Sequence, residues 1–199
     1  FEVNGNKYTV TGLSATVTGK DAGKYTSKVT GKAVVKDAAG NNVTKQFTVN
    51  TENGSLVISK ATVTLKSADL DKEYDGKALV NGEKALATET GWAEGEGATY
   101  KFTGSQTVVG SSANAFTYTL NEGTKADNYE IKKTEGKLTV KDRETKYEIT
   151  VKANDGTATY DGKDHTVSGF EATTFEVNGN KYTVTGLSAT VTGKDAGKY

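Results

Sequence analysis

The chain has 199 residues, with 25 basic and 25 acidic side chains, so its formal net charge at pH 7 is zero. No overall field therefore favours nucleic acid or an anionic membrane, and a single arginine, Arg143, makes a reader of phosphates and bases unexpected. The absence of cysteine excludes disulfides, thiolate metal sites and cysteine nucleophiles, and no apolar run approaches the roughly 20 residues that span a bilayer.

Residues 1–60 read as β-structure. Within residues 1–10, the pair Asn4-Gly5 tolerates the positive φ angles of a tight hairpin turn. Residues 13–17 alternate apolar and small polar side chains, as a half-buried strand does. The pattern predicts further strands, or weak strands, at 25–35, 43–49 and 56–58, and turns at 37–42 and 52–54.

Asp21-Ala-Gly-Lys-Tyr25 leads into one of these strands. A D-x-G-x-Y run resembles the tyrosine corner of immunoglobulin-like sandwiches. We therefore expect the Tyr25 hydroxyl to hydrogen-bond backbone a few residues upstream.

Residues 61–145 continue the β pattern. Residues 78–88 have some helical propensity, but Asn81-Gly82 in their middle argues against a helix, and the glycine-rich 91–97 reads as a loop. Strands are predicted at 61–65, 100–102, 107–109, 116–120, 128–131 and 137–140. Short strands with frequent turns indicate a sandwich or barrel.

The chain also repeats itself. Residues 1–25 are identical to residues 175–199 at all 25 positions, an offset of 174. This period is composite, because Val63–Lys66 matches Ile149–Lys152 at an offset of 86. At the same offset Tyr74-Asp-Gly-Lys77 recurs as Tyr160-Asp-Gly-Lys163, and residues 53–60 parallel residues 135–141.

The repeats define two related modules, A and B. Residues 1–60 are the back portion of a module A, residues 61–145 are a complete module B, and residues 146–199 are the front portion of the next module A. We expect the chain to be a window in a longer array. The links at Lys60–Ala61 and Asp142–Thr145 contain no glycine, which predicts stiff junctions between modules.

Several of the repeated motifs resemble those of a known family. The Tyr-Asp-Gly-Lys runs at 74–77 and 160–163, with Asp127–Ile131 and Gly136–Val140, resemble the YDG/MBG-type tandem modules of bacterial, Gram-positive-like surface adhesins. Module A departs from this pattern at Val43–Phe47. The resemblance implies an all-β, cell-wall-linked or secreted multi-repeat protein without catalytic residues. The fold it implies is a series of Ig-like β-sandwich modules end to end, or alternatively β-grasp-like modules.

Few residues suggest chemistry. His165, the only histidine, stands in a turn and has no evident partners for a triad or metal site. Asn154, Asp155, Asp161 and Asp164 lack the spacing of a calcium loop. Trp92, the only tryptophan, could stack on a sugar ring or could cap the core. We predict no enzyme, no metal site and no cofactor.

A Lys–Asn isopeptide bond is one further possibility for a cysteine-free surface domain. It needs an uncharged lysine, an asparagine and a neighbouring acid in an apolar pocket, where burial shifts both pKa values. The candidates are Lys66 or Lys152 with Asn128 or Asn50. Strand lysines more commonly face water.

Three functions follow for an extracellular, cell-surface chain. The first is a rigid stalk that projects an adhesive tip, in which each module contacts its neighbours in the same chain. The alternative is a multivalent adhesin module that binds a host glycan or protein. The third is a filament in which chains join head to tail by completing each other's split module A; the surplus copy of the 25 identical residues argues against it.

Overall fold

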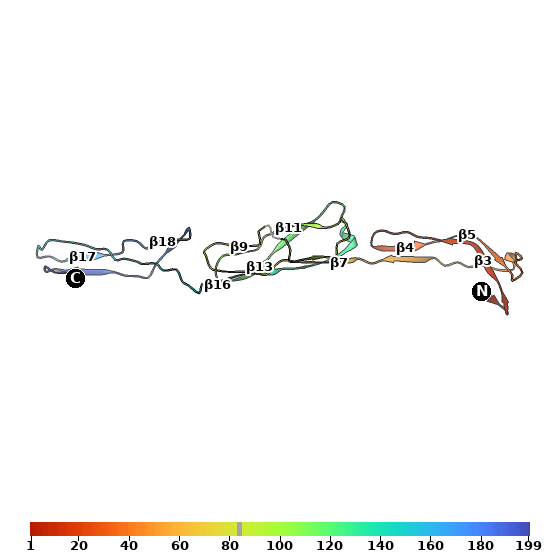
Figure 1. The fold of residues 1–199 in the computed structure, drawn as a ribbon, viewed down its shortest axis with the longest axis horizontal. Coiled ribbons are helices and arrows are strands. Elements are labelled where there is room, and N and C mark those ends of the chain that lie inside the picture. Colours follow the sequence, from red (N-terminus) through yellow and green to blue (C-terminus); the bar gives the residue numbers. More distant parts are fainter. Residues whose placement is uncertain (83–84) are drawn as a thin grey trace. The chain divides into compact units, whose positions relative to one another are not determined.

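The computed structural model describes residues 1–82 and 85–199. Within them the chain is all-β, which confirms that prediction, and its helical segments are two 3₁₀ turns, η1 (Thr44–Gln46) and η2 (Ala126–Asn128) (Figure 1). The part of the chain that the structure describes has no helix long and apolar enough to cross a membrane. The residues form two compact units. Unit 1 comprises residues 1–68, 85–102 and 115–136, and unit 2 comprises residues 69–82, 103–114 and 137–199.

Unit 1 contains eleven of the strands. They are β1 (Glu2–Val3), β2 (Asn6–Lys7), β3 (Thr9–Ala15), β4 (Gly23–Ser27), β5 (Val29–Lys36), β6 (Gly54–Ile58), β7 (Ala61–Lys66), β10 (Thr88–Thr90), β11 (Ala98–Phe102), β14 (Phe116–Leu120) and β15 (Tyr129–Thr134).

The remaining strands belong to unit 2, apart from the first residue of β16. They are β8 (Leu70–Glu73), β9 (Leu79–Val80), β12 (Ser105–Gln106), β13 (Gly110–Asn114), β16 (Gly136–Lys141), β17 (His165–Ser168), β18 (Thr174–Val177), β19 (Asn180–Thr183) and β20 (Thr190–Gly193).

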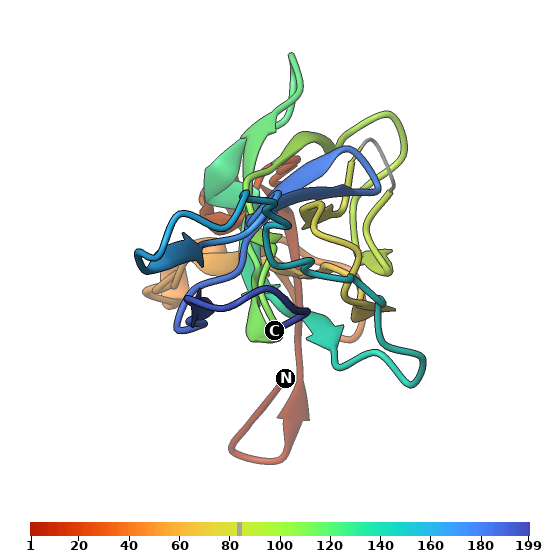
Figure 2. The ribbon, with the colours of Figure 1, turned by 90° about the vertical axis from the view of Figure 1, so that its left-hand side faces the viewer.

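The N-terminal repeat consists of antiparallel pairs. β1 and β2 form the predicted hairpin (Figure 2, red), whose turn residues Asn4 and Gly5 have φ angles of 49° and 79°. β3 pairs with β5, and β4 pairs with β6. The Tyr25 hydroxyl donates to the Asp21 carbonyl at 2.9 Å, so the expected tyrosine contact is confirmed.

Two predicted strands are wrong. Within residues 43–49 the chain forms η1, because the Asn42 side chain accepts hydrogen bonds from the backbone and hydroxyl of Thr44. Such local side-chain bonds compete with a strand. Residues 107–109 are a bend between β12 and β13, since Gly110 with φ 137° begins the next strand.

Within unit 1, the centre of module B is built around β7. β7 lies between β10, which is antiparallel to it, and β15, which is parallel, with Tyr129 opposite Ala61. The inward side chains of these strands and β14 form the core cluster, which consists of Val63, Leu65, Phe116 and Tyr129. Val63 and Leu65 are fully buried and alternate with Thr64, as expected of a strand with one covered face.

Unit 2 contains a second parallel pair. β16 lies between β13 and β8, and Leu138 is opposite Leu70. Leu138 and Val140 are buried. This pair and the β7–β15 pair share one register, since each residue pairs with the residue 68 positions later. The first and last segments of module B therefore run parallel within each unit.

The identical 25-residue segments form different strand pairs. In the first copy, residues 9–15 are β3 and pair with β5, while residues 16–19 are outside any strand. In the second copy, residues 190–193, the equivalents of 16–19, are β20 and pair with β17. Residues 184–189, the equivalents of 10–15, are outside any strand there. The difference follows from which neighbouring segments, 26–60 or 146–174, each copy has beside it in sequence.

Candidate functional site

Modules A and B are joined by a polar contact within unit 1. The Asp21–Tyr25 corner presents its carboxylate and one backbone N–H to η2 of module B. The Asn128 amide donates to Asp21 at 2.9 Å, and its oxygen accepts from the Ala22 N–H at 2.8 Å. Lys125 lies 2.7 Å from the other Asp21 oxygen. We call these four residues the A–B clasp.

The electrostatics of the A–B clasp favour charged Asp21. The hydrogen bond from Asn128, followed by the contact with Lys125, lowers the pKa of Asp21 below its ordinary value of 3.8. Asp21 in turn raises the pKa of Lys125. The Asn128 amide donates to the Asp21 carboxylate and accepts from the Ala22 N–H. It therefore holds the loop in one orientation and also favours the charged form of Asp21.

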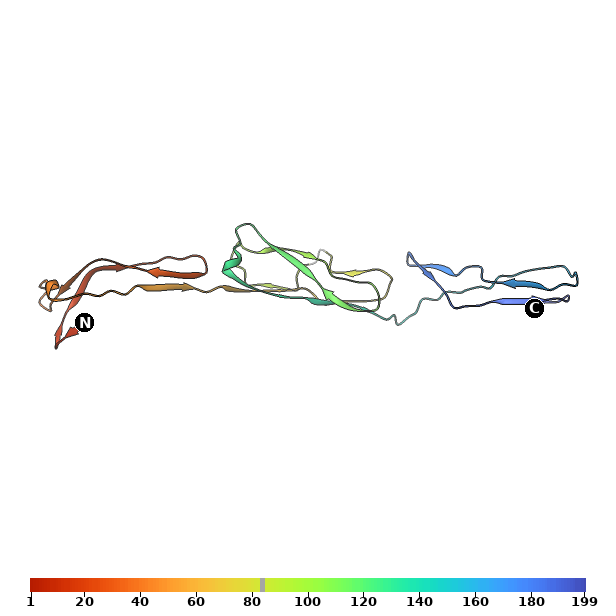
Figure 3. The same ribbon diagram turned by 180° about the vertical axis from the view of Figure 1, so that it is seen from behind.

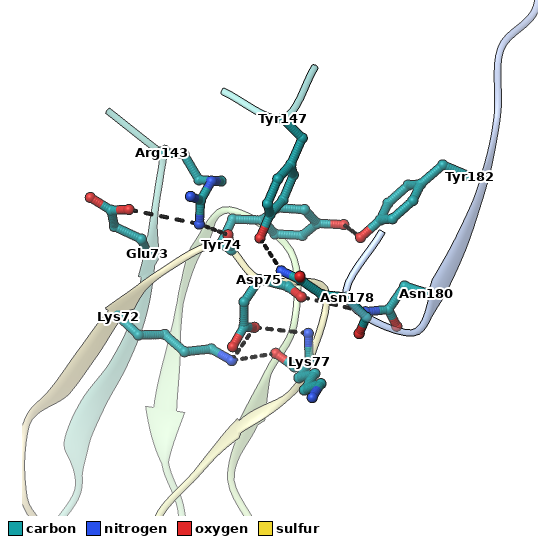
Figure 4. Close-up of polar contacts among 10 residues, drawn as sticks. All are labelled: Lys72, Glu73, Tyr74, Asp75, Lys77, Arg143, Tyr147, Asn178, Asn180 and Tyr182. Atoms are coloured by element: carbon teal, nitrogen blue, oxygen red, sulfur yellow. Dashed lines mark hydrogen bonds and ion pairs between the residues drawn. The ribbon is translucent and has the colours of Figure 1, made fainter. Parts of the chain in front are cut away.

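A second clasp lies in unit 2, where the Tyr74–Lys77 loop of module B meets the β18–β19 hairpin of the next module A (Figure 4). The hydroxyls of Tyr74 and Tyr182 are 3.2 Å apart. The Asn180 amide donates to the Asp75 carbonyl at 3.4 Å. The Tyr74 hydrogen bond, followed by partial burial, raises the pKa of Tyr182 to about 12.

The loop that receives the hairpin is itself held in shape. Asp75 accepts a hydrogen bond from the Lys77 N–H at 2.9 Å and contacts Lys72, whose ammonium also donates to the Lys77 carbonyl at 2.6 Å. The Lys72 contact is the main cause of a lowered Asp75 pKa. Gly76 has a φ of 77°, which favours glycine in the turn, and a Cβ there would lie 2.4 Å from the Tyr182 hydroxyl and would displace that side chain.

The link between modules B and A adds the only arginine. The Arg143 guanidinium lies 4.2 Å from the centre of the Tyr147 ring and donates to the Tyr74 carbonyl at 3.3 Å. The Tyr147 hydroxyl accepts from Asn178 at 2.7 Å. Arg143 and Tyr147 thus connect the link to both sides of the contact. With Tyr74, Asp75, Asn180 and Tyr182 they form what we call the B–A clasp (Figure 4).

Both clasps use the identical 25-residue segment, at opposite ends. In the second copy, Asn180 and Tyr182 of the hairpin contact the module B that precedes it. In the first copy, Asp21 and Ala22 of the corner contact the module B that follows it. In the first copy Tyr8, the equivalent of Tyr182, instead packs 4.8 Å from Phe47, ring centre to ring centre. One sequence therefore supplies both contact surfaces.

Sequence patterns do not assign these residues to one site. They identify Tyr74–Lys77 as a repeated motif, Arg143 as the only arginine and Asp21–Tyr25 as a corner. The signals that could have connected them are the complete identity of residues 1–25 and 175–199 and the position of Arg143 in a link. The pairing of an asparagine in η2 with Asp21 has no sequence signal, since their separation is 107 residues.

Trp92 lies half-buried against the core cluster. Its ring is 4.9 Å from that of Tyr129 in an edge-on arrangement, and its N–H donates to Glu89 at 3.1 Å. Glu89 also accepts from the Tyr100 hydroxyl at 2.6 Å. The indole thus packs on the core and makes its hydrogen bond within the module.

The four isopeptide candidates lie as follows. Asn128 adjoins Tyr129, and Tyr129 is opposite Ala61 in the parallel ladder. Lys66 is five residues beyond Ala61 on the same strand, about 16 Å further along at 3.3 Å per residue. The structure therefore does not bring Lys66 and Asn128 together. Lys152 contacts Glu171 and Asp155, and these acids raise its pKa. Asn50 is exposed in unit 1.

His165 is the first residue of β17 and does not stand in a turn as predicted, because it pairs with Gly193 of β20. His165 lies 2.9 Å from Asp161, and Asp161 also accepts from the Lys163 N–H at 3.0 Å. Within residues 1–82 and 85–199 no group of three or more His, Cys, Asp or Glu side chains could hold a metal ion.

Comparison with protein-family models, with curated proteins and with solved structures finds no match. The two clasps, which lie where the repeats meet, are therefore the main guide to function.

Proposed function

We propose that this chain is a structural repeat segment of a long bacterial cell-surface protein, in which rigid modules act as a stalk for an adhesive tip. The observation that carries the proposal is that side-chain contacts join the neighbouring modules at both junctions. A stalk transmits position only if its modules hold a fixed mutual orientation, and short links with polar clasps limit rotation at the links.

The repeat pattern supports the same function. The 25 residues found twice are those that contact module B on both sides, so adding an A–B pair to an array adds one A–B clasp and one B–A clasp. Such arrays depend mainly on contacts between neighbours. Length can then increase without any new interface.

The cell-surface location and the YDG/MBG-type family belong to this proposal. They rest on the Tyr74–Lys77 and Tyr160–Lys163 motifs and on the cysteine-free composition. We also propose that each complete module is an Ig-like sandwich. This is supported by the all-β content and by the tyrosine corner at Tyr25.

A distance measurement across the B–A clasp tests the stalk. The chain has no cysteine, so Lys137→Cys and Lys181→Cys place two spin labels at exposed positions on either side of the link. We expect a narrow distance distribution that broadens when Asn180→Ala and Tyr182→Ala are added. An equally broad distribution in both proteins would show free rotation and overturn the proposal. The matched control is Asn6→Ala with Tyr8→Ala, the same residues in the first copy.

A further inference from the structure

The first and last segments of module B run in the same direction in both units. In unit 1, β7 and β15 lie side by side and pair in parallel (Figure 3). In unit 2, β8 pairs in parallel with β16. The chain enters module B along residues 61–73 and leaves it along residues 129–141. We call these the entry segment and the exit segment.

The direction of the two segments decides how tension along the chain acts on them. Module A precedes the entry segment through Lys60, and the next module A follows the exit segment through Asp142. A pull between these two residues draws β7 and β8 toward their amino ends and β15 and β16 toward their carboxyl ends. Because the paired strands are parallel, the two pulls are opposed along the strand direction and each ladder is sheared. The evenly spaced hydrogen bonds of a sheared parallel ladder carry the load together, and they do not open one after another.

Side-chain hydrogen bonds continue the pairing where the entry segment passes from β7 to β8. Residues 67–69 belong to no strand. Within unit 1 the Ser67 N–H donates to the Thr134 carbonyl at 3.2 Å, and the Gly136 N–H donates to the Ser67 hydroxyl at 2.8 Å. Within unit 2 the Lys137 N–H donates to the Asp69 carboxylate at 2.7 Å. The exit segment is therefore bonded to the entry segment at this bend as well as along the strands.

The two segments also approach each other closely at the bend. A Cβ on Gly136 would lie 2.4 Å from the Ala68 carbonyl oxygen and 2.5 Å from that of Ser67, so any other residue would push the backbones apart. Ser67 is fully buried there. Each paired residue of the exit segment is 68 positions after its partner in the β7–β15 ladder and again in the β8–β16 ladder. The two segments thus keep one register on both sides of the bend.

Buried side chains cover one face of each ladder. Val63 and Leu65 of β7 are fully buried in unit 1, and Leu138 and Val140 of β16 are fully buried in unit 2. A hydrogen bond beside such side chains is stronger than one in water, because the local dielectric constant is low. Shearing either ladder must also move these side chains out of their apolar surroundings, which adds to the cost.

Each segment is the middle strand of a sheet in one unit. In unit 1, β7 of the entry segment lies between β10 and β15, and in unit 2, β16 of the exit segment lies between β13 and β8. Sliding of the entry segment in unit 1 therefore breaks two ladders at once, and so does sliding of the exit segment in unit 2.

We infer that module B is a load-bearing module, in which the parallel ladders between the entry and exit segments resist tension along the chain. The source of this tension rests on the proposed function, because a stalk with an adhesive tip is pulled through its links. The resistance itself depends on module B alone. Forced unfolding is governed by the rate of unfolding, so the ladders act by raising the barrier to unfolding under load.

Force spectroscopy on the full chain tests the inference. The chain has no cysteine, so Lys60→Cys/Asp142→Cys attaches handles at exposed positions on either side of module B and shears the ladders. Lys60→Cys/Asp127→Cys, also at exposed positions, pulls β7 and β15 from the same end, so that their bonds open one after another. We expect the 60/142 pair to yield at a several-fold higher force than the 60/127 pair. Equal forces, or a lower force for the 60/142 pair, overturn the inference.

The length released on unfolding identifies the part that has opened. The 82 residues from Lys60 to Asp142 span at most about 270–300 Å when extended, so unfolding of module B gives a long step. Opening of either clasp releases no chain between the handles, because Asp21 and Tyr182 lie outside residues 60–142. A failure of the proposed stalk is therefore visible in the spin-label distances, and a failure of the load-bearing ladders is visible in the 60/142 force.

A double variant at the bend tests whether the two segments bear load in one register. Ser67→Ala with Asp69→Ala removes the acceptors of the Gly136 and Lys137 N–H groups. We expect a lower force for the 60/142 pair and an unchanged force for the 60/127 pair, whose opening begins at Ala61. Thr62→Ala, at an exposed position of β7, is the matched control and should leave both forces unchanged.

The long step also shows that the double variant was folded before it was pulled. A double variant that keeps the full 60/142 force, or that weakens the 60/127 pair to the same extent, contradicts the inference.

Discussion

The hydroxyl groups of Tyr74 and Tyr182 lie 3.2 Å apart, although the two residues belong to different repeats and are separated by 108 positions. The contact joins the loop that both modules share, Tyr-Asp-Gly-Lys, to the hairpin of the segment that occurs twice. A motif that appears to serve only its own module thus also contacts the next one. This relationship makes the junctions the part of the chain where substitutions are most informative.

Tyr182→Phe removes one hydroxyl from the B–A clasp and keeps the ring. A typical hydrogen bond contributes enough that its loss should make hydrogen exchange of the Tyr74 amide, which donates to the Lys141 carbonyl at 2.9 Å, roughly twofold to tenfold faster. Tyr8→Phe is the matched control, because Tyr8 has the same sequence context and its ring packs against Phe1 and Phe47. Equal acceleration by both variants would show that the effect is not due to the clasp.

Asp21→Ala should loosen the A–B clasp, since it removes the acceptor of both Asn128 and Lys125. Exchange at the Ala22 and Asn128 amides should rise, and proteolysis near Lys60 should become faster by a similar factor of roughly twofold to tenfold. Asp195→Ala changes the identical position of the second copy, whose carboxylate makes no hydrogen bond or ion pair within residues 1–82 and 85–199. It should leave both readouts unchanged. A similar response to both variants contradicts the clasp.

Acid should open the A–B clasp before it affects the core. The pKa of Asp21 is lowered from 3.8 in the folded chain, so its contribution to stability is fully present above about pH 4 and is lost as the pH falls through the lower folded value. The carboxyl carbon shift of Asp21 in a pH titration should have its midpoint below 3.8. Asn128→Ala, which removes the largest cause of the shift, should move this midpoint upward; no movement would contradict the assignment.

Sequence patterns predicted the features that depend on near neighbours. The Asn4-Gly5 turn and the Tyr25–Asp21 contact are confirmed because they are determined within a few residues. The predicted strand at 43–49 was wrong because the Asn42 side chain accepts hydrogen bonds from Thr44 and forms a local turn. The partner of Asn128 could not be predicted, since side-chain alternation identifies a strand or a turn and carries no information about which distant loop faces it.

The identical segments show most clearly that local sequence alone does not determine where strands form. Residues 10–15 lie in a strand and residues 184–189 do not, although the two sequences are the same. No property of the segment alone can predict both outcomes. Their difference depends on Val29–Lys36, which follows the first copy and supplies the strand that pairs with it.

Leu138→Ala and Leu56→Ala compare one motif in a complete and a partial module. Leu138 is fully buried beside β8, so its truncation should reduce the free energy of unfolding by about 2–5 kcal/mol. Leu56 is half-buried, and within residues 1–82 and 85–199 its strand β6 pairs with β4 alone, so less apolar contact is lost there and the reduction should be well under half as large. Chemical unfolding gives both values. Equal losses would show that β6 is already as well packed as β16.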